Sequence, residues 1–407
     1  MRVTKICRQL IGVEAVYASE VELMPGGLVF AVRPRWRKPR CGGCGRCAGR
    51  YDRAASRHWR HMAVGATVVW LRYAPWRVAC PGCGVTVEQV PWAGHNRRFT
   101  RGLEELVADL ARAMDFTAIT RLLGVSWRAV AGIVERVVAE RLPDARLTGL
   151  RRIGVDEFSY RKRHRYLTVV VDHDRGEVVW AAKGRGADAL AGLFEHLGEA
   201  GCAAIESVTM DMAGGYKKAV REHLPHARIV FDRFHVQRLA GDAVDTVRRS
   251  EVRGVEDPAM ARVIKRSRYA LLKSPWNMSR GEHQKLADIQ ANNARLYRAR
   301  LLNDTLADAL AYRQPKRARQ ALEEWLAWAS RSKLEAFVRL AKTIREHKEG
   351  ILAYIQDRLT NGFVEGINNR LRTIARRAYG FHSAESLIAM LFLCAGGIEL
   401  NPPLPTH

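Results

Sequence analysis

The spacing of apolar side chains changes several times along the 407-residue chain. Up to about residue 95, apolar positions alternate in short runs such as 28–32 and 67–71, with Gly, Pro and cysteine pairs between them. This pattern predicts a small β-rich module. From 100 to 141, apolar residues recur every three or four positions in three groups, which predicts three consecutive helices.

The pattern after residue 150 is that of an α/β domain followed by a helical one. Residues 152–249 predict the order strand, strand, strand, helix, strand, helix, strand, helix. Residues 251–348 have a helical pattern throughout, and Asn361-Gly362 begins a last amphipathic region. The chain is therefore predicted to be a multidomain α/β protein with boundaries near 95, 150, 250 and 350, and its length agrees with two or three domains of about 150 residues.

The charge of the chain indicates a polyanionic partner. Lys and Arg number 67 against 42 Asp and Glu, a formal net charge of +25. Such an excess favours nucleic acid first and an anionic membrane surface second. The N-terminal residues lack the apolar core of a secretory signal, and the longest weakly polar run, 387–398, is shorter than the roughly 20 residues that cross a bilayer. We therefore expect a cytoplasmic, nucleoid-associated protein without a membrane span.

Two cysteine pairs predict a structural zinc site. Cys41 and Cys44, and then Cys80 and Cys83, each have the two-residue spacing that lets thiolates converge on one tetrahedral ion. The bound ion would replace the core that so small a β module cannot build. Alternatives are free cysteines, an iron–sulfur site including Cys47, or replacement of one ligand by Cys47, His58 or His61.

Residues 116–138, FTAITRLLGVSWRAVAGIVERVV, have the pattern of a helix-turn-helix. One helix ends at Gly124, Ser126 can cap the next, and the second helix has an apolar inner face. Its outer face would present Trp127, Arg128, Ala131 and Arg136 to the major groove of duplex DNA. Any three-helix unit gives a similar pattern, and the net charge favours the DNA-binding interpretation.

Two aspartates occupy matching positions in the α/β segment. Asp156 lies within the first predicted strand and Asp211 at the end of the fourth. In a ribonuclease-H-like sheet these strands are neighbours, so the two carboxylates would meet at one cleft and hold Mg²⁺ or Mn²⁺. Taken singly, Asp211 could be a helix cap and Asp156 a buried ion-pair partner. Asp232 and His235, at the end of the fifth strand, could assist there or be a cap and a structural histidine.

Three stretches resemble one known family. The segments IGVDEFSYRKRHRYLTVVVD, VTMDMAGGYKKAVREHLPHARIVFDRFHV and NGFVEGINNRLRTIARRAYGFHS are similar to the ISL3 group of bacterial insertion-sequence transposases. The resemblance covers nearly the whole chain, and it implies an acidic triad of Asp156, Asp211 and Glu365. It also implies a zinc-finger module (1–95), a helix-turn-helix domain (96–150) and a ribonuclease-H-like catalytic core (151–250 and 351–407) interrupted by an all-helical insertion (251–350).

The pattern around Glu365 agrees with that implied role. Apolar residues recur every three or four positions from 363 to 378, which predicts a helix with one buried face. The opposite face carries Glu365, Asn368, Asn369, Arg372 and Arg376. Since the i+3 and i+4 neighbours of Glu365 are amides, an ion pair within the helix is a weak explanation for the carboxylate. Arg372 and Arg376 are predicted to hold DNA phosphates.

The resulting expectation is a metal-dependent DDE transposase. It would bind the terminal inverted repeats of its element, cleave a strand at each end and transfer the freed 3′-hydroxyl to target DNA. Pairing two ends suggests a homodimer or higher oligomer on double-stranded DNA. The alternatives are a non-enzymatic DNA-binding regulator derived from a transposase and a ribonuclease-H-like nuclease without strand transfer.

Overall fold

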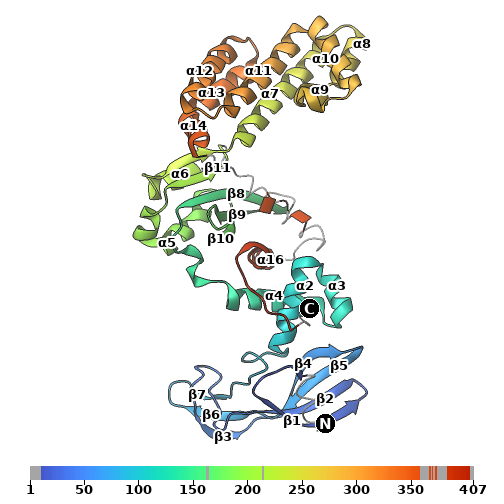
Figure 1. Cartoon of the computed structure of the whole chain (residues 1–407), viewed down its shortest axis with the longest axis vertical. Coiled ribbons are helices and arrows are strands. Elements are labelled where there is room, and N and C mark those ends of the chain that lie inside the picture. The colour runs from blue at the N-terminus through green and yellow to red at the C-terminus, as the bar shows by residue number, and fades with distance from the viewer. Residues whose placement is uncertain are drawn as a thin grey trace. The chain divides into compact units, whose positions relative to one another are not determined.

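The computed structural model describes residues 11–161, 165–212, 215–357, 366–367, 369, 372–373 and 383–403. The chain forms two compact units, which Figure 1 shows in one cartoon. One unit comprises Met1–Asp144 with Leu371–His407, and the other comprises Ala145–Arg370. No helix in the described part of the chain combines the length and the apolar character that crossing a bilayer requires.

The first unit begins with a four-stranded sheet of order β1-β2-β5-β4. Its strands are β1 (Val16–Met24), β2 (Gly27–Pro34), β4 (Arg57–Val64) and β5 (Thr67–Tyr73). The alternating runs thus form strands as predicted. The side chains on their inner face, among them Phe30, Trp59 and Leu71, are buried. Trp92 closes this core with its ring edge-on to Trp59, the two centroids lying 5.5 Å apart.

A second, three-stranded sheet of order β3-β6-β7 follows in the same unit. It consists of β3 (Gly49–Arg53), β6 (Trp76–Cys80) and β7 (Gly84–Val87). Its fully buried apolar residues in the described chain are only Cys41, Val78 and Cys80. A core of this size cannot offset the entropy of ordering three strands, so this sheet requires another source of stability.

The described part of the first unit also contains the helices α2 (Arg101–Ala113), α3 (Phe116–Leu123), α4 (Trp127–Arg141) and α16 (Ala384–Ala395). The three helices predicted between 100 and 141 are confirmed. Helix α16 packs on α2 and α4, and Arg112 donates a hydrogen bond of 3.1 Å to the carbonyl oxygen of Leu393. The sequence grouped residues 351–407 with the α/β core, whereas α16 belongs to the first unit. Its apolar residues occur around the whole helix, so the pattern does not tell which partner covers them.

The second unit contains a five-stranded sheet of order β10-β9-β8-β11-β12. Strands β8 (Arg152–Arg161), β9 (Arg165–Asp172) and β10 (Glu177–Lys183) are antiparallel, whereas β11 (Ser207–Met210) runs parallel to both β8 and β12 (Arg228–Phe231). Helices α5 (Ala187–Ala203) and α6 (Tyr216–His223) connect the later strands. The predicted order of strands and helices is confirmed, and the first and fourth strands are neighbours.

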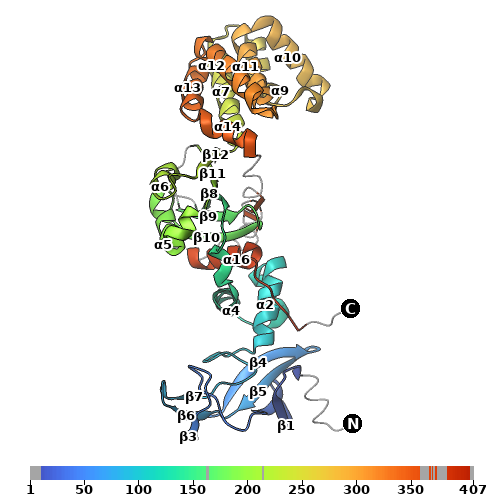
Figure 2. The same ribbon diagram turned by 60° about the vertical axis from the view of Figure 1, so that its left-hand side comes forward.

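The described residues of the second unit after β12 are mainly helical. Its elements are α7 (Arg233–Gly254), α8 (Pro258–Lys265), α9 (Arg268–Leu272), α10 (Arg280–Asn292), α11 (Ala294–Ala311), α12 (Pro315–Arg331), α13 (Glu335–Glu346) and α14 (Lys348–Asp357). Helix α7 leaves directly from the end of β12, and α14 returns to pack against β12 (Figure 2). A Cβ atom at Gly350 would lie 2.5 Å from Cδ2 of Phe231, so α14 approaches the strand through a glycine. The helical segment therefore starts and finishes at the same strand of the sheet.

Candidate catalytic, metal and DNA-binding sites

The register of two parallel strands brings Asp156 and Asp211 to the same level of the sheet. Ser207 of β11 lies opposite Arg152 of β8, and Thr209 lies opposite Gly154. Asp156 lies two residues after Gly154, and Asp211 lies two residues after Thr209. Because parallel strands keep their register, the two carboxylates emerge from adjacent strands at one end of the pairing.

Both aspartates line one cavity of about 420 Å³. Burial raises the pKa of the Asp156 carboxyl, and the negative charge of Asp211 adds to the increase, while the hydrogen bond from the backbone N–H of Glu157 opposes it. Tyr216 also lines the cavity, and its hydroxyl lies 2.9 Å from Oγ1 of Thr168. A buried carboxylate that faces a second carboxylate forms a site that favours a divalent cation.

Helix α7 supplies two cationic or polar partners to Asp211. Nδ1 of His235 lies 3.1 Å from Oδ2 of Asp211, and Nη2 of Arg238 lies 3.3 Å from the same oxygen. His235 was a sequence candidate, whereas Arg238 was not. Its position three residues after His235, on the same face of a helix, is the signal that could have identified it.

Asp232 takes a different position from His235. Its side chain is buried and accepts a hydrogen bond of 3.0 Å from the backbone N–H of Phe234, so it caps the N-terminus of α7. The cap fixes the start of the helix that presents His235 and Arg238. Asp232 therefore supports the cavity through the backbone.

The third predicted acid, Glu365, lies outside the described residues, and so does Arg376. Arg372 is helical, and its side chain is exposed. The role predicted for Glu365 thus stays a prediction. The described chain contributes the first two acids of the implied triad to one cavity.

Four thiols converge in the β module. The Sγ atoms of Cys41, Cys44, Cys80 and Cys83 all lie within 4.8 Å of one another, as the binding of one ion by both cysteine pairs requires. Cys47 is exposed outside this cluster. His61 is buried, with Nδ1 2.9 Å from Oγ1 of Thr100, and burial lowers its pKa to about 4. Among the predicted sets of metal ligands, the geometry favours the two cysteine pairs.

The donor chemistry of this cluster fits a tetrahedral ion. Backbone N–H groups of Cys44 and Gly43 lower the pKa of the Cys41 thiol to about 7. Hydrogen bonds with Cys44 and Cys41 raise the pKa of Cys83 to about 12. Neighbouring thiols cannot all ionise without a cation between them, and Zn²⁺ is the ion that four thiolates prefer.

The predicted helix-turn-helix is present as α3, a tight turn and α4. Gly124 ends α3 with a φ of +62°, a left-handed conformation that glycine adopts without strain, and Ser126 accepts a hydrogen bond from the N–H of Ala129. Arg128 is exposed in the first turn of α4. Of the α4 residues predicted to face the major groove, Arg128 is the one with an exposed side chain.

The other predicted contact residues of α4 also serve in packing. Trp127 packs on Phe116, with ring centroids 5.4 Å apart. Arg136 forms an ion pair of 2.6 Å with the buried carboxylate of Glu104 on α2. Ala131 is buried, so its placement on the outer face was wrong: the apolar stripe of α4 is broader than the sequence pattern indicated.

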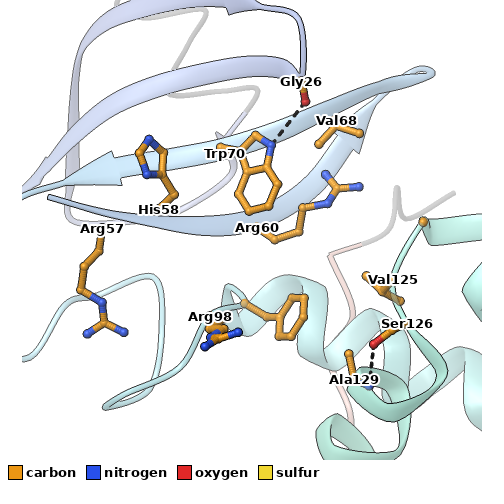
Figure 3. Close-up of a pocket in the computed structure, with 12 residues that line it drawn as sticks. Gly26, Arg57, His58, Arg60, Val68, Trp70, Arg98, Val125, Ser126 and Ala129 are labelled. Atoms are coloured by element: carbon orange, nitrogen blue, oxygen red, sulfur yellow. Dashed lines mark hydrogen bonds between the residues drawn. The ribbon is translucent and has the colours of Figure 1, made fainter.

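A basic cavity of about 790 Å³ lies beside the N-terminus of α4. Figure 3 shows Arg57, His58 and Trp70 on the sheet side and the turn residues Val125 and Ser126 opposite. Arg60 is buried and donates a hydrogen bond of 3.2 Å to the carbonyl oxygen of Leu123, which joins the sheet to the turn. None of the described residues that line the cavity is acidic, so the potential there favours an anion.

Comparisons with known proteins agree with this geometry. A family model for DDE transposases of the ISL3 type, described as transposase, matches residues 153–391. A model for the helix-turn-helix domain of transposase family ISL3 matches residues 88–138. The chain is 38% identical to the transposase for insertion sequence element IS1557 of Mycobacterium tuberculosis, over all of this chain and 98% of that protein. It is 29% identical to the transposase for IS1001 of Bordetella parapertussis, over 88% and 89% of the two chains.

Proposed function

Because the chain belongs to the ISL3 family of transposases, we propose that it is the DDE transposase of an insertion sequence. It binds the terminal inverted repeats of its element, cleaves a strand at each end and joins the freed end to target DNA. The observation that carries the proposal is the β8–β11 register, which brings Asp156 and Asp211 to one cavity. The sheet order β10-β9-β8-β11-β12 supports a ribonuclease-H-like core with helices α7–α14 as its insertion.

In this proposal Asp156, Asp211 and Glu365 hold Mg²⁺ or Mn²⁺, because carboxylate oxygens are the ligands that these hard cations prefer. The bound ions would polarise the scissile phosphate and stabilise the charge on the attacking and leaving oxygens. His235, 3.1 Å from Asp211, orients that carboxylate, and Arg238 supplies positive charge next to it.

The chemistry consists of two phosphoryl transfers. Water attacks the phosphodiester at the element end, and the bond from phosphorus to the 3′-oxygen breaks, which leaves a 3′-hydroxyl and a 5′-phosphate. The 3′-hydroxyl then attacks a target phosphodiester, loses its proton, and releases a target 3′-hydroxyl. The protein forms no covalent bond with DNA and contributes position and charge.

The test is a nicking reaction on labelled end DNA. The purified chain should nick this DNA at the element boundary with Mg²⁺ or Mn²⁺ and leave it intact in EDTA. Nicking that is equal in EDTA, or that occurs equally on a random duplex, would contradict metal-dependent end cleavage.

End recognition is assigned to the helix-turn-helix, with Arg128 as the base-reading side chain. We expect Arg128→Ala to reduce the preference for end DNA over random DNA by about 5- to 150-fold, as one bidentate base contact contributes about 1–3 kcal/mol. Competition binding with both duplexes measures this ratio. Equal loss of affinity for both DNAs would show that Arg128 contacts only phosphates.

The third acid is assigned to Glu365. Glu365→Gln keeps the size of the side chain and removes its charge, so it should bind end DNA normally and fail to nick it in Mg²⁺. Glu349→Gln is the matched control, since Glu349 forms ion pairs with Arg319 on the helical segment. Near-normal nicking by Glu365→Gln together with loss of nicking in Glu349→Gln would show that Glu365 is not the third acid.

Zinc at the four cysteines holds the β module together in this proposal, and pairing of two element ends requires at least a dimer in the active complex. Exposed Arg372 is assigned to DNA phosphates, as is Arg376. Duplex DNA, as element end and as target, is therefore the proposed partner.

A further inference from the structure

A strongly basic segment precedes the first zinc knuckle and has no role in the sites above. Residues 33–40 read RPRWRKPR, so five of eight side chains are basic and none is acidic. The segment leaves the end of β2 and reaches Cys41. All five basic side chains are exposed.

The backbone of this segment is fixed at both ends. The N–H of Arg35 donates a hydrogen bond of 2.8 Å to the carbonyl oxygen of Ala15. The carbonyl oxygen of Pro39 accepts one of 3.1 Å from Ala48, and that of Arg40 accepts one of 2.8 Å from Gln89. The basic side chains are therefore presented from an ordered backbone, which lowers the entropy cost of binding a ligand.

Aromatic rings orient the guanidinium groups. Arg33 and Arg35 lie 5.0 and 5.2 Å from the ring centroid of Tyr17. Arg50 and Arg53 of β3 lie 4.9 and 4.1 Å from the centroid of Trp76. Stacking on a ring holds the charge in place without neutralising it.

Four of these arginines line one groove of about 300 Å³, which we call the arginine groove: Arg33, Arg37, Arg50 and Arg53. In the described part of the chain none of the four forms an ion pair with a carboxylate, whereas Arg77 on the neighbouring strand pairs with Asp52. Glu88 is the one acid among the described lining residues, and it is buried, accepting hydrogen bonds from Tyr73 and Trp76. The groove thus presents a net positive charge to solvent.

We propose that the arginine groove binds the phosphate backbone of duplex DNA, as a second contact on the end DNA that α4 reads. The inference rests on the proposed function and adds a residue set and a contact type to it. Charge complementarity favours phosphates. The aromatic residues that line the groove are Trp36, Tyr73 and Trp76, and a guanidinium group lies over each of these rings. Unpaired bases would need such rings for stacking, so a duplex fits better than a single strand.

The test compares Arg33→Ala/Arg37→Ala with Arg151→Ala/Arg295→Ala in the full chain. Both double variants remove two exposed positive charges, but Arg151 and Arg295 are paired with Glu206 and Glu251. Affinity for end duplex, random duplex and single-stranded DNA is measured over a range of salt concentrations. Zinc content and melting temperature verify that the module stays folded.

The groove variant should lower the slope of log affinity against log salt by about 2, since each phosphate contact contributes about 0.9. It should weaken both duplexes alike and keep the preference for end DNA, while the control keeps the wild-type slope. An unchanged slope, or a loss confined to single-stranded DNA, would overturn the inference. A failure of end recognition by α4 can be distinguished from a failure of the groove proposal. In that case the wild type would bind end and random duplex equally, while the groove variant would still lower the salt slope.

Discussion

Asp156→Asn and Asp211→Asn should each reduce nicking of end DNA at least about 10³-fold while the affinity for that DNA stays within about 2-fold of wild type. Each substitution keeps the shape of the side chain and removes one anionic metal ligand, and bound ions contribute several kcal/mol of transition-state stabilisation. Both residues line one cavity in the second unit, whereas the helix-turn-helix belongs to the first. Parallel nicking and gel-shift assays on the same end DNA measure the two effects.

Asp188→Asn is a matched control for this pair. Asp188 is an exposed carboxylate in the first turn of α5, outside the residues that line the cavity. It should nick end DNA at close to the wild-type rate. Robust nicking by Asp156→Asn or Asp211→Asn would remove that residue from the metal site, and equal loss in Asp188→Asn would indicate a non-specific effect of charge.

The second large effect concerns the cysteine cluster. The purified, reduced chain should contain about one zinc per molecule, and Cys80→Ser should lose it and unfold the three-stranded sheet. The reason is that this sheet buries so few apolar residues of its own. Metal analysis measures the zinc, and amide hydrogen exchange over residues 49–87 measures the unfolding.

Cys47→Ser provides the control, since Cys47 lies close in sequence but outside the cluster. It should keep the zinc and the protection of the sheet. Absence of zinc from freshly prepared wild type, or equal zinc loss in the Cys47 and Cys80 variants, would contradict the assignment of ligands.

Features carried by short-range patterns were predictable. Period-2 and period-3.6 spacing located the strands and helices, and the two-residue cysteine spacing identified the four thiols that converge. The pairing of Asp156 with Asp211 was predictable because it follows from strand order, and the β8–β11 register agrees with it.

Features that depend on contacts between distant segments were not predictable. Arg136 looks like a DNA contact on an isolated helix, and its pairing with Glu104 depends on how α2 packs. The location of α16 against α2 and α4 depends on a choice among several apolar surfaces. The spacing of Arg238 from His235 places both on one face of α7, but the contact of Arg238 with Asp211 depends on how α7 packs beside the sheet. Sequence patterns specify which face of an element is buried but not its partner.

Strand transfer by the wild-type chain tests the central claim most directly. A labelled, pre-nicked end DNA carrying a 3′-hydroxyl is incubated with protein, Mg²⁺ and a target plasmid, beside the same DNA with a 3′-deoxy terminus. We expect the 3′-hydroxyl end to become covalently joined to the plasmid and the 3′-deoxy end to remain unjoined. Nicking of intact ends without any joining would identify a nuclease, and end binding with neither product would identify a non-enzymatic regulator; either result would contradict the account.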